Sequence, residues 1–561
     1  MPKSRPSAIS QSATLPTSSD PDFDFLVIGS GFAGSLIASI LQTQGRRVAI
    51  VDRTNHPRFA IGESSTPAAS LILSSLAQQY DLTWLKPFAK YGTWKKNYPK
   101  ITTGRKRGFS YFHHEAGKPF QPQPDHSNEL LAAASDSDEV SDTQWLRSDV
   151  DAFFFKQACE SGVVSFENSE VTSLARSTKG WTVELTSTEQ GAAVPTKSLF
   201  AGFLIDASGA GQVLARHLNI RDDTDKLATN SRAIFGHVTG LPQWSTSLEQ
   251  SHPGSTTNHP FNADHAAQHH ILEEGWLWSL RFDDDITSVG LVLNDLATAQ
   301  SSTLSAEEEF FQIINRYPGL RAAFSQVTFT APSDKPVRTK RLQRLSSEIA
   351  GDGWAMLPHT AGFIDPLHST GIAHSLARIE HLAAILLAKN STVSKALPDP
   401  ALQRYDSIVR EELTLIDQLV AGCYDAIAKG SFKKLAAFTM CYFAAATTWE
   451  RRCLNDETAL ASDGPLHQVT RRISEGQSSA QNERPALLCA DDAGFRTAVV
   501  NLRDRMPHET DESFETLCKE TLAPFNHVGL FEPLIPNMYG ATALPDGWEH
   551  RTSNIERPTS K

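Results

Sequence analysis

Three glycines near the start of the chain have the spacing that binds a dinucleotide. They follow an apolar run at residues 25–28 and open a helical pattern, and an acidic residue ends the next apolar run. Such a turn lets the backbone approach a pyrophosphate at a helix N-terminus, and the acid can accept a hydrogen bond from a ribose hydroxyl. The residues expected to line this site are Gly29, Gly31, Phe32, Ala33, Gly34 and Asp52. At this point FAD and NAD both remain open as the dinucleotide.

Two later segments carry polar residues at fixed spacings. Residues 58–64 read RFAIGES, and residues 365–372 read DPLHSTGI. Both resemble segments that line the flavin in the flavin-dependent halogenases and their relatives among the flavin monooxygenases, which favours FAD over NAD. The resemblance assigns to FAD binding Arg58, Gly62, Glu63, Ser64, Asp365, Gly371 and Ile372. Alternatively, Glu63 and Ser64 only cap the helix that begins near Pro67.

A basic stretch leads to a lysine that the same resemblance singles out. Residues 106–112 read KRGFSYF, and their alternation predicts a strand. The segment resembles the strand that carries the active-site lysine of flavin-dependent halogenases, so Lys106 is the expected catalytic lysine. Lys90 partly fits the same pattern and stays the second candidate. For any lysine in so basic a stretch, the alternative is a solvated surface charge.

A tryptophan pair lies in the middle of the chain. Residues 275–282 read GWLWSLRF, which resembles the W-x-W-x-I-P motif of the same family. The resemblance implies that Trp276 and Trp278 separate the flavin from the substrate. Leu280 and Arg281 depart from the motif, and a charge at Arg281 needs a partner or water. Two alternating tryptophans on a strand are also ordinary cross-strand packing.

The segment that ends in DPLHSTGI carries two further expectations from the resemblance. The halide is expected at the backbone amides of Ser369, Thr370 and Gly371. His368 stands where tryptophan halogenases have a glutamate, and it is expected either to act as a base near neutral pH or only to line the site. Pro358 and His359 replace the usual Gly-Asp pair, so this half of the segment departs from the family.

Two more patterns belong to the elements that must position the site. Arg147 and Asp151 lie four residues apart on one face of an expected helix, a spacing that either forms a plain ion pair or, by resemblance, brings the chain back towards the flavin. Asp206 ends an apolar run in the sequence DASG, where the superfamily returns beside the dinucleotide. We group Arg147 and Asp206 with the cofactor site and expect Asp206 to act mainly through structure.

The resemblance implies a halogenase. It would use FADH2 from a separate flavin reductase, O2, and chloride or bromide to halogenate an electron-rich aromatic or pyrrole-type small molecule, either free or tethered to a carrier. The motifs are most similar to the branch that acts on pyrrolnitrin precursors and tetracyclines. A flavin monooxygenase of the same fold is the alternative, since Arg281 alters the tryptophan motif. A flavin-binding protein without turnover would not explain why the lysine, the tryptophan pair and the halide segment occur together.

The expected fold is of the α/β class. Residues 21–390 are expected to form a Rossmann-like FAD-binding domain with an inserted antiparallel, substrate-facing layer, at about 90–130 and 220–345. Residues 391–561 are expected to be mostly helical, and residues 1–20, rich in Ser, Pro and Thr, are expected to be a disordered leader.

Composition excludes several classes of protein. A net charge of −12 and a pI near 5.9 argue against nucleic-acid binding, which depends on clustered Lys and Arg. The six cysteines form no C-x-x-C pair and have no histidine spacing typical of zinc, so no metal site is expected. No apolar run reaches the ~18 residues that cross a bilayer, so we expect no membrane span and a cytoplasmic protein.

Overall fold

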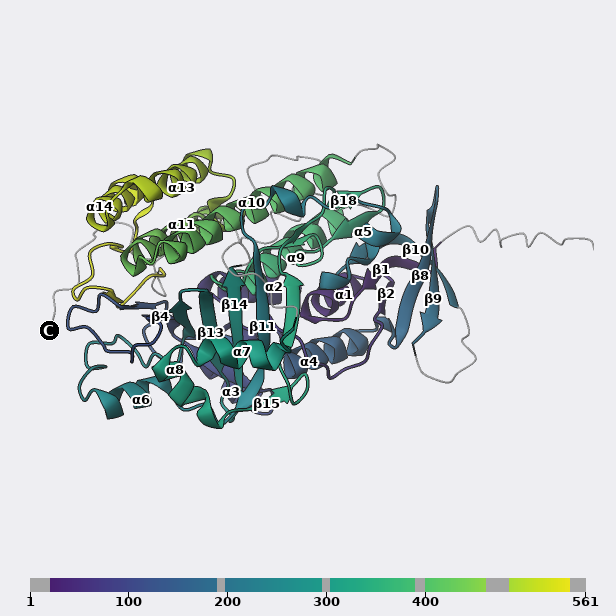
Figure 1. Ribbon diagram of the computed structural model, residues 1–561. Coiled ribbons are helices and arrows are strands. Elements are labelled where there is room, and N and C mark those ends of the chain that lie inside the picture. The colour runs from purple at the N-terminus through teal and green to yellow at the C-terminus, as the bar shows by residue number, and fades with distance from the viewer. Residues whose placement is uncertain (1–20, 189–196, 295–302, 389–398, 461–483, 545–561) are drawn as a thin grey trace, which may run out of the picture.

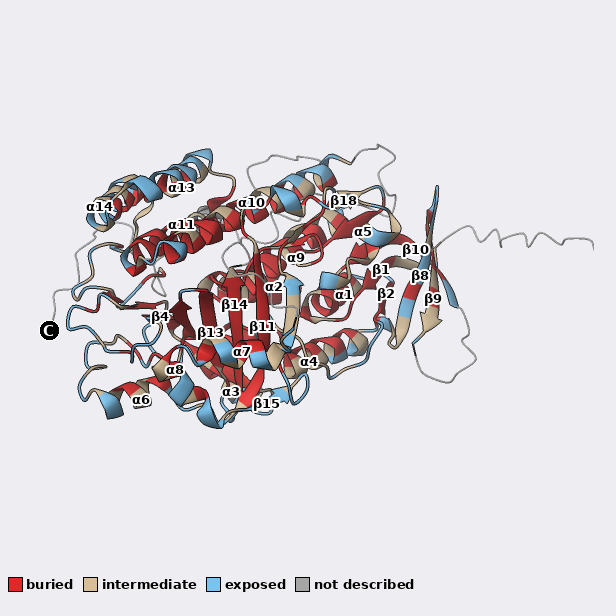
Figure 2. Cartoon of the chain, viewed as in Figure 1, coloured by how far each residue is buried: buried red, intermediate tan, exposed pale blue. Residues whose placement is uncertain are grey.

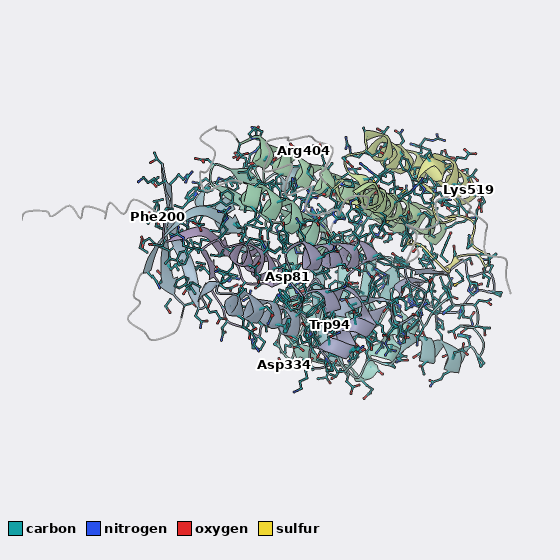
Figure 3. The ribbon with its side chains drawn as sticks, turned by 180° about the vertical axis from the view of Figure 1, so that it is seen from behind. Asp81, Trp94, Phe200, Asp334, Arg404 and Lys519 are labelled. Carbon is teal, nitrogen blue, oxygen red and sulfur yellow. The ribbon has the colours of Figure 1, made fainter. Side chains whose placement is uncertain are left out.

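The computed structural model describes residues 21–188, 197–294, 303–388, 399–460 and 484–544 (Figure 1). Two sheets lie side by side, and long helices from the second half of the chain cover them (Figure 1). Phe200 and Lys519 mark opposite ends of the molecule (Figure 3). The expected leader lies outside the described residues.

The first sheet is a Rossmann-type sheet with the order β18-β19-β10-β1-β2-β7, and β8 and β9 extend it beside β10. β1 pairs in parallel with both β2 and β10, as expected for strands buried on both faces. Its strands are β1 (Phe23–Ile28), β2 (Val48–Val51), β7 (Val164–Phe166), β8 (Ser169–Ser177), β9 (Gly180–Ser187), β10 (Lys197–Asp206), β18 (Ala350–Gly351) and β19 (Trp354–Met356).

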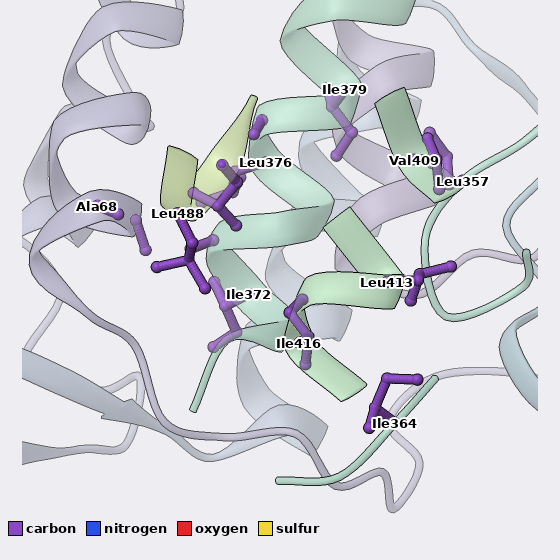
Figure 4. Packing of buried hydrophobic residues seen from close by; sticks show 14 of the residues in the cluster. Ala68, Leu357, Ile364, Ile372, Leu376, Ile379, Val409, Leu413, Ile416 and Leu488 are labelled. Atoms are coloured by element: carbon purple, nitrogen blue, oxygen red, sulfur yellow. The ribbon is translucent and has the colours of Figure 1, made fainter. Parts of the chain in front are cut away.

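Helices cover this sheet and bury the main core. They include α1 (Phe32–Thr43), α2 (Pro67–Gln79), α4 (Arg147–Glu160), α5 (Val213–His217) and α9 (Gly371–Ala388). Figure 4 shows Ile372, Leu376 and Ile379 of α9 packing in one cluster with side chains of a C-terminal helix. α9 is long and apolar enough to cross a membrane by length and composition, but 61% of it is buried within the protein. Packing in this core therefore accounts for its apolar sequence.

The second sheet has the order β15-β11-β14-β13-β12-β4-β5-β21, with β16 beside β11. Its strands are β4 (Gly108–His113), β5 (Glu129–Ala133), β11 (Ser231–Thr239), β12 (Ala267–Leu272), β13 (Gly275–Arg281), β14 (Thr287–Asn294), β15 (Thr328–Ala331), β16 (Val337–Arg341) and β21 (Met538–Tyr539). Most neighbours are antiparallel, as the sequence predicts. The β12–β4 and β21–β5 pairs are parallel, and each joins strands from distant parts of the chain.

The prediction of a single strand over residues 106–112 is wrong. β3 (Thr103–Lys106) ends at the lysine and pairs with β6 (Asp142–Trp145) in a separate ribbon, whereas β4 begins at Gly108. A side chain at Gly108 would overlap the backbone oxygen of Ala132 on β5, so only glycine allows the chain to enter the large sheet there. Lys106 consequently lies where the ribbon and the large sheet meet.

The C-terminal portion contains the helices α10 (Pro400–Ala428), α11 (Phe432–Leu460), α13 (Ala493–Arg505) and α14 (Asp511–Leu522). α10 and α11 pack inwards, while α13 and α14 expose their outer faces (Figure 2). The expectation of a helical portion did not include β21, which pairs with β5 of the second sheet. The remaining helices are α3 (Tyr91–Asn97), α6 (Trp244–Ser251), α7 (Ala306–Ile314) and α8 (Pro318–Ala323), and β17 (Arg344–Leu345) pairs with β20 (Gly362–Phe363).

Candidate active site

The glycine turn joins β1 to α1 in the expected place. Gly29 has a φ of +104°, and a Cβ there would lie 2.5 Å from the backbone oxygen of Ala207. A Cβ at Gly34 would overlap the backbone oxygen of Gly29. At Gly31 the nearest atom to an added Cβ is 3.5 Å away, on Asp151. Packing therefore requires the first and third glycines, whereas the second leaves space beside a helix N-terminus, where a phosphate can bind.

Asp52 lies at the end of β2 and is held by its neighbours. Its Oδ2 accepts hydrogen bonds from the backbone N of Ser30 at 2.8 Å and from Nη2 of Arg58 at 2.7 Å. Its Oδ1 accepts one from the backbone N of Thr54 at 3.0 Å. Burial acts to raise the pKa of Asp52, but Arg58 and these hydrogen bonds outweigh it and lower the pKa. Arg58 thus lies with Asp52, at the end of the site expected to hold adenosine.

Arg147 and Asp151 form a buried, two-point ion pair. Nε and Nη2 of the arginine each lie 2.8 Å from a carboxylate oxygen, and the two side chains are 8% and 1% exposed. Nη1 also donates to the backbone oxygens of Ile61 and Gly62, at 2.8 and 3.1 Å. The guanidinium lies 4.8 Å from the ring centre of Phe32. The pair is therefore more than a surface ion pair, since it ties α4 to both the glycine turn and the 58–64 segment.

Glu63 and Ser64 do not cap α2. The N-cap of that helix is Thr66, whose side chain makes no capping hydrogen bond. Oε1 of Glu63 instead lies 2.6 Å from Nε2 of His237 on β11. The hydroxyl of Ser64 is buried and has no partner within the described structure. Because buried polar groups normally have partners, this hydroxyl fits a polar group of a bound flavin.

Asp206 acts within the protein. Its Oδ1 accepts a hydrogen bond from the backbone N of Ser208 at 2.9 Å, and its Oδ2 accepts one from the backbone N of Leu214 at 2.7 Å. Burial raises its pKa. The carboxylate stabilises the turn that leads from β10 to α5. Because this turn packs against Gly29, Asp206 supports the glycine turn indirectly.

Asp365 anchors the third motif segment. Its Oδ2 accepts hydrogen bonds from the hydroxyls of Ser231, at 2.7 Å, and Tyr424, at 3.0 Å, and its Oδ1 accepts one from the backbone N of Leu367 at 3.1 Å. Burial raises its pKa to about 6. The segment is thereby fixed to β11 on one side and to α10 on the other.

The expected halide segment leads into the N-terminus of α9. Ser369 has a φ of +53°, and Ser369 and Thr370 are buried, as is Ile372 in the first turn. A Cβ at Gly371 would lie only 2.6 Å from Nε2 of His359. That nitrogen is itself buried without a partner in the described structure. A helix N-terminus faced by an unsatisfied imidazole nitrogen is a place for a polar or anionic ligand.

Lys106 is buried, being 1% exposed, and is not a solvated surface charge. Its Nζ donates to the backbone oxygen of Ser65 at 2.5 Å, directly after the 58–64 segment, and lies 4.2 Å from the ring centre of Phe109. Burial lowers its pKa to about 7, although Asp142 acts in the opposite direction. Lys90, the second candidate, is only half-buried and is the N-cap residue of α3. The geometry therefore favours Lys106.

Trp276 and Trp278 lie on the same face of β13, with ring centres 6.1 Å apart. Nε1 of Trp276 donates to the hydroxyl of Tyr424 at 3.0 Å, and Nε1 of Trp278 donates to the hydroxyl of Ser288 at 3.1 Å. Both rings are buried, so each indole is oriented by a hydrogen bond as well as by packing.

Arg281, which replaces the proline of the tryptophan motif, does not reach the tryptophan rings. Its Nε donates to Oδ1 of Asp264 at 2.9 Å, and Nη1 donates to the backbone oxygen of Leu241 at 2.9 Å. Nη2 donates to the backbone oxygen of Pro242. The guanidinium of Arg281 is thus paired and hydrogen-bonded within the segment between β11 and β12.

Six buried rings near Lys106 contact one another, and we call this set the aromatic compartment. Its members are Phe109, Tyr111, His269, Trp276, His368 and Tyr442. The ring of Phe109, beside Lys106, lies 5.7 Å from Tyr442, which stacks on His368 at 4.7 Å. On the other side His269 lies 5.0 Å from Trp276. The compartment therefore connects the lysine with the tryptophan pair and with the halide segment.

His368 is less basic than the sequence suggests. It is buried, and burial lowers its pKa to about 4. Its Nε2 lies 3.8 Å from the sulfur of Cys423, and its Nδ1 has no partner in the described structure. His368 is consequently neutral near pH 7, and one of its two ring nitrogens carries no proton.

Several residues of the site are not evident from the sequence. His269 bonds through Nε2 to the backbone oxygen of Leu367 at 3.1 Å, and Tyr424 bridges Trp276 and Asp365. The histidine-rich composition of residues 230–300 was the one available signal for His269. Its position depends on the parallel β12–β4 pairing, which periodicity does not reveal.

Comparison with known proteins agrees with this geometry. Residues 27–95 match the family described as an NAD(P)-binding Rossmann-like domain, and residues 144–431, just over half of the chain, match the family described as tryptophan halogenase. The chain is 27% identical over 404 residues to tetracycline 7-halogenase of Kitasatospora aureofaciens, an alignment that covers 71% of this chain and 68% of that protein. It is 29% identical over 418 residues to monodechloroaminopyrrolnitrin halogenase PrnC of Pseudomonas fluorescens, covering 72% and 68%.

Solved structures share the fold. The halogenase PltM in complex with phloroglucinol and FAD superposes with a TM-score of 0.78 at 23% identity, covering 93% of this chain and 99% of that one. The L111Y mutant of PltM in complex with FAD gives a TM-score of 0.77 at 24% identity, covering 90% of this chain and 96% of that one.

Fold and site together define a flavoprotein with a Rossmann-type FAD domain. More specifically, the chain belongs to the tryptophan halogenase family and is a flavin-dependent halogenase.

Proposed function

We propose that this protein halogenates an electron-rich aromatic or pyrrole-type small molecule, and that Lys106 delivers the oxidant. The observation that carries the proposal is the position of the Lys106 amine. It is buried at the boundary between the flavin segments, through Ser65, and the aromatic compartment, through Phe109. FAD, when bound and reduced, would supply the electrons that activate O2, and the activated oxygen would oxidise chloride or bromide to hypohalous acid with release of water.

The residues around Lys106 suit that role. With a pKa of about 7, the lysine presents both an ammonium and a free amine near neutral pH, so it can orient hypohalous acid or take up its halogen. The cofactor is held, in this proposal, by the glycine turn, Arg147 and the unsatisfied groups of Ser64 and His359. The halide is held at the amides of Ser369, Thr370 and Gly371.

The substrate lies in the aromatic compartment in this proposal. Stacked rings accept a planar arene, and Trp276 and Trp278 keep it from the flavin, so that only the diffusing oxidant reaches it. His368, neutral near pH 7, accepts the proton that the substituted ring loses. Its low pKa makes it a weak base, which is sufficient for the strongly acidic proton of a halogenated ring cation.

The proposal includes two partners. A separate flavin reductase supplies FADH2, and the substrate is a small molecule, either free or bound to a carrier. One relative, from Pseudomonas fluorescens, is named 1H-pyrrole-2-carbonyl-[peptidyl-carrier protein] chlorinase, which supports the carrier alternative. Within the described residues the cysteines form no disulfide, which fits a reducing compartment such as the cytoplasm.

The test combines the protein with FAD, a flavin reductase, NADH, O2 and bromide, and offers phenol and pyrrole probes. We expect products whose mass shows replacement of hydrogen by bromine, and loss of these products in Lys106→Met with FAD affinity retained. Lys90→Met is the matched control and should keep activity, because Lys90 is only half-buried and lies at the N-terminus of α3, outside the flavin segments and the six rings of the aromatic compartment.

Hydroxylated products without bromine would support the monooxygenase alternative instead. Full activity in Lys106→Met together with loss in Lys90→Met would reverse the assignment of the lysine. FAD binding without turnover of any probe would support a flavin-binding protein that is not an enzyme. This conclusion requires a control assay showing that the reductase delivers FADH2 to the protein.

A further inference from the structure

A cluster of two histidines and a glutamate lies at the second sheet, outside the site described above. His126 precedes β5, Glu129 is the first residue of β5, and His259 lies between α6 and β12. Nδ1 of His126 is 3.4 Å from Oε1 of Glu129, and Nε2 of His259 is 3.0 Å from Oε2. The three side chains are 6%, 0% and 3% exposed, so solvent does not separate them.

The buried carboxylate needs positive charge. Within the described part of the chain, no lysine or arginine lies within 4.0 Å of Glu129, and the two imidazoles are its ion-pair partners. A neutral imidazole brings no charge, and an uncompensated buried carboxylate costs several kcal/mol. Either a bound proton or a bound metal ion must therefore balance Glu129.

The spacing of the donor atoms favours a metal ion. The three ligand atoms lie within 4.8 Å of one another. Charge-assisted hydrogen bonds between nitrogen and carboxylate are about 2.7–2.9 Å long, so the 3.4 Å separation of His126 and Glu129 is long for one. Ligands about 2.0–2.1 Å from a tetrahedral zinc ion lie roughly 3.3 Å apart, which is close to the two separations here.

A neighbouring amide adds an orienting partner of the kind that metal-bound histidines have. Nδ2 of Asn258 lies 3.3 Å from Nε2 of His126, and the opposite orientation of the amide would let its oxygen accept the N–H of a metal-bound imidazole. Two imidazoles and a carboxylate suit zinc, whereas magnesium and calcium prefer oxygen ligands.

We propose that His126, Glu129 and His259 bind one zinc ion, with water as the fourth ligand. The ion fastens the segment before β12 to the start of β5. It also steadies the C-terminal segment, because Nδ2 of Asn537 donates to the backbone oxygen of His126 at 2.8 Å and β21 pairs with β5. The site is structural and separate from the flavin, so its test does not depend on halogenation.

The test uses the full-length, tag-free protein, stripped with a chelator and titrated with Zn2+ or Co2+. We expect one equivalent of zinc by elemental analysis, the visible absorption of tetrahedral cobalt, and a zinc-dependent rise in melting temperature. His259→Ala and Glu129→Gln should abolish all three signals, and Asn258→Ala should weaken affinity by about 10–100-fold. His252→Ala, in the same segment but outside the cluster, is the control and should bind as the wild type does.

Glu129→Gln keeps the shape of the carboxylate, so it separates loss of metal from failure to fold, which circular dichroism would reveal. Zinc binding by Glu129→Gln or His259→Ala with wild-type affinity and stoichiometry would overturn the proposal. Failure of the folded, stripped wild-type protein to take up one equivalent of either metal would overturn it as well.

Discussion

The indole nitrogen of Trp276 donates a 3.0 Å hydrogen bond to the hydroxyl of Tyr424, and that hydroxyl donates in turn to Asp365. A strand of the second sheet, a C-terminal helix and the 365–372 segment are thus joined through one buried phenol. The orientation of the tryptophan is therefore coupled to the position of this segment.

Replacement of Tyr424 by Phe tests this coupling. The change leaves Trp276 Nε1 without its buried partner and removes one of the two hydrogen bonds to Oδ2 of Asp365, so we expect the free energy of unfolding to fall by about 1–3 kcal/mol. Urea denaturation followed by tryptophan fluorescence measures the loss. Tyr424→Phe should also weaken FAD affinity. Tyr98→Phe is the control: it removes a hydroxyl that donates to the backbone oxygen of Trp84, away from the site, and should leave FAD affinity unchanged. Equal FAD affinity in both variants would contradict the coupling.

The buried amine of Lys106 predicts an unusual dependence of stability on pH. Burial lowers its pKa to about 7, whereas the unfolded chain keeps the usual value near 10.5. Between these values the unfolded state binds more protons, so the contribution of Lys106 to stability rises with pH and is smallest at and below pH 7. The unfolding free energy of the wild type minus that of Lys106→Met should therefore increase by up to about 1.4 kcal/mol per pH unit in this range. A difference independent of pH would show that the amine is not desolvated.

The contact between Gly371 and His359 predicts a pair of coupled variants. In Gly371→Ala the new Cβ would lie 2.6 Å from Nε2 of His359, so the imidazole must move into the space at the N-terminus of α9. We expect FAD to bind at least tenfold more weakly, and His359→Ala to remove most of this additional effect in the double variant. Gly540→Ala is the control, because no atom lies within 4 Å of its added Cβ. Additive effects of Gly371→Ala and His359→Ala, measured by fluorescence titration with FAD, would contradict the predicted contact.

Glu412 on α10 should dominate the stability of the helical portion. Its carboxylate accepts hydrogen bonds from His374 of α9 at 3.0 Å and from the backbone N of Leu487 at 2.7 Å, and lies 3.4 Å from Arg378. Glu412→Ala leaves buried cationic and polar groups unpaired, so we expect a loss of about 3–5 kcal/mol in the free energy of unfolding.

The control for Glu412 is the exposed ion pair of Glu115 and Lys118. Glu115→Ala should change the free energy of unfolding by less than about 1 kcal/mol.

The contribution of Glu412 to stability also depends on pH. Burial acts to raise the pKa of Glu412, but Arg378 and the hydrogen bonds outweigh it and lower the pKa. The contribution of Glu412 is therefore complete above the pKa of the unfolded chain, and it is lost as the pH falls towards the folded value. Similar losses for the two variants in urea would contradict this reading.

Local patterns in the sequence predicted the Rossmann-type half well. The glycine turn and the helix that begins near Pro67 depend on short-range spacing, and the structure has both in the expected places. Resemblance to the family predicted the flavin-dependent halogenase class, which the family match confirms. The division into domains and the roles of the site residues stay predictions.

Periodicity could not predict how distant segments meet. Lys106 was placed inside a strand because the alternation continues into residues 108–112, but the steric demand at Gly108 divides the two strands. The partners of Arg281 lie 17–40 residues earlier in the chain, and the place of His269 depends on the pairing of β12 with β4, which are more than a hundred residues apart. Neither contact leaves a local signal in the sequence.

The pairing of β21 with β5 has a consequence for how the chain reaches its native state. β5 would otherwise be an edge strand, with unpaired backbone groups open to other chains. Its cover is translated last among the described strands, so during synthesis the sheet beside the aromatic compartment remains open while the Rossmann-type sheet already has all its strands. The edge of β5 therefore stays open to pairing with other chains until β21 has been made, which makes it a site of aggregation risk in the newly made chain.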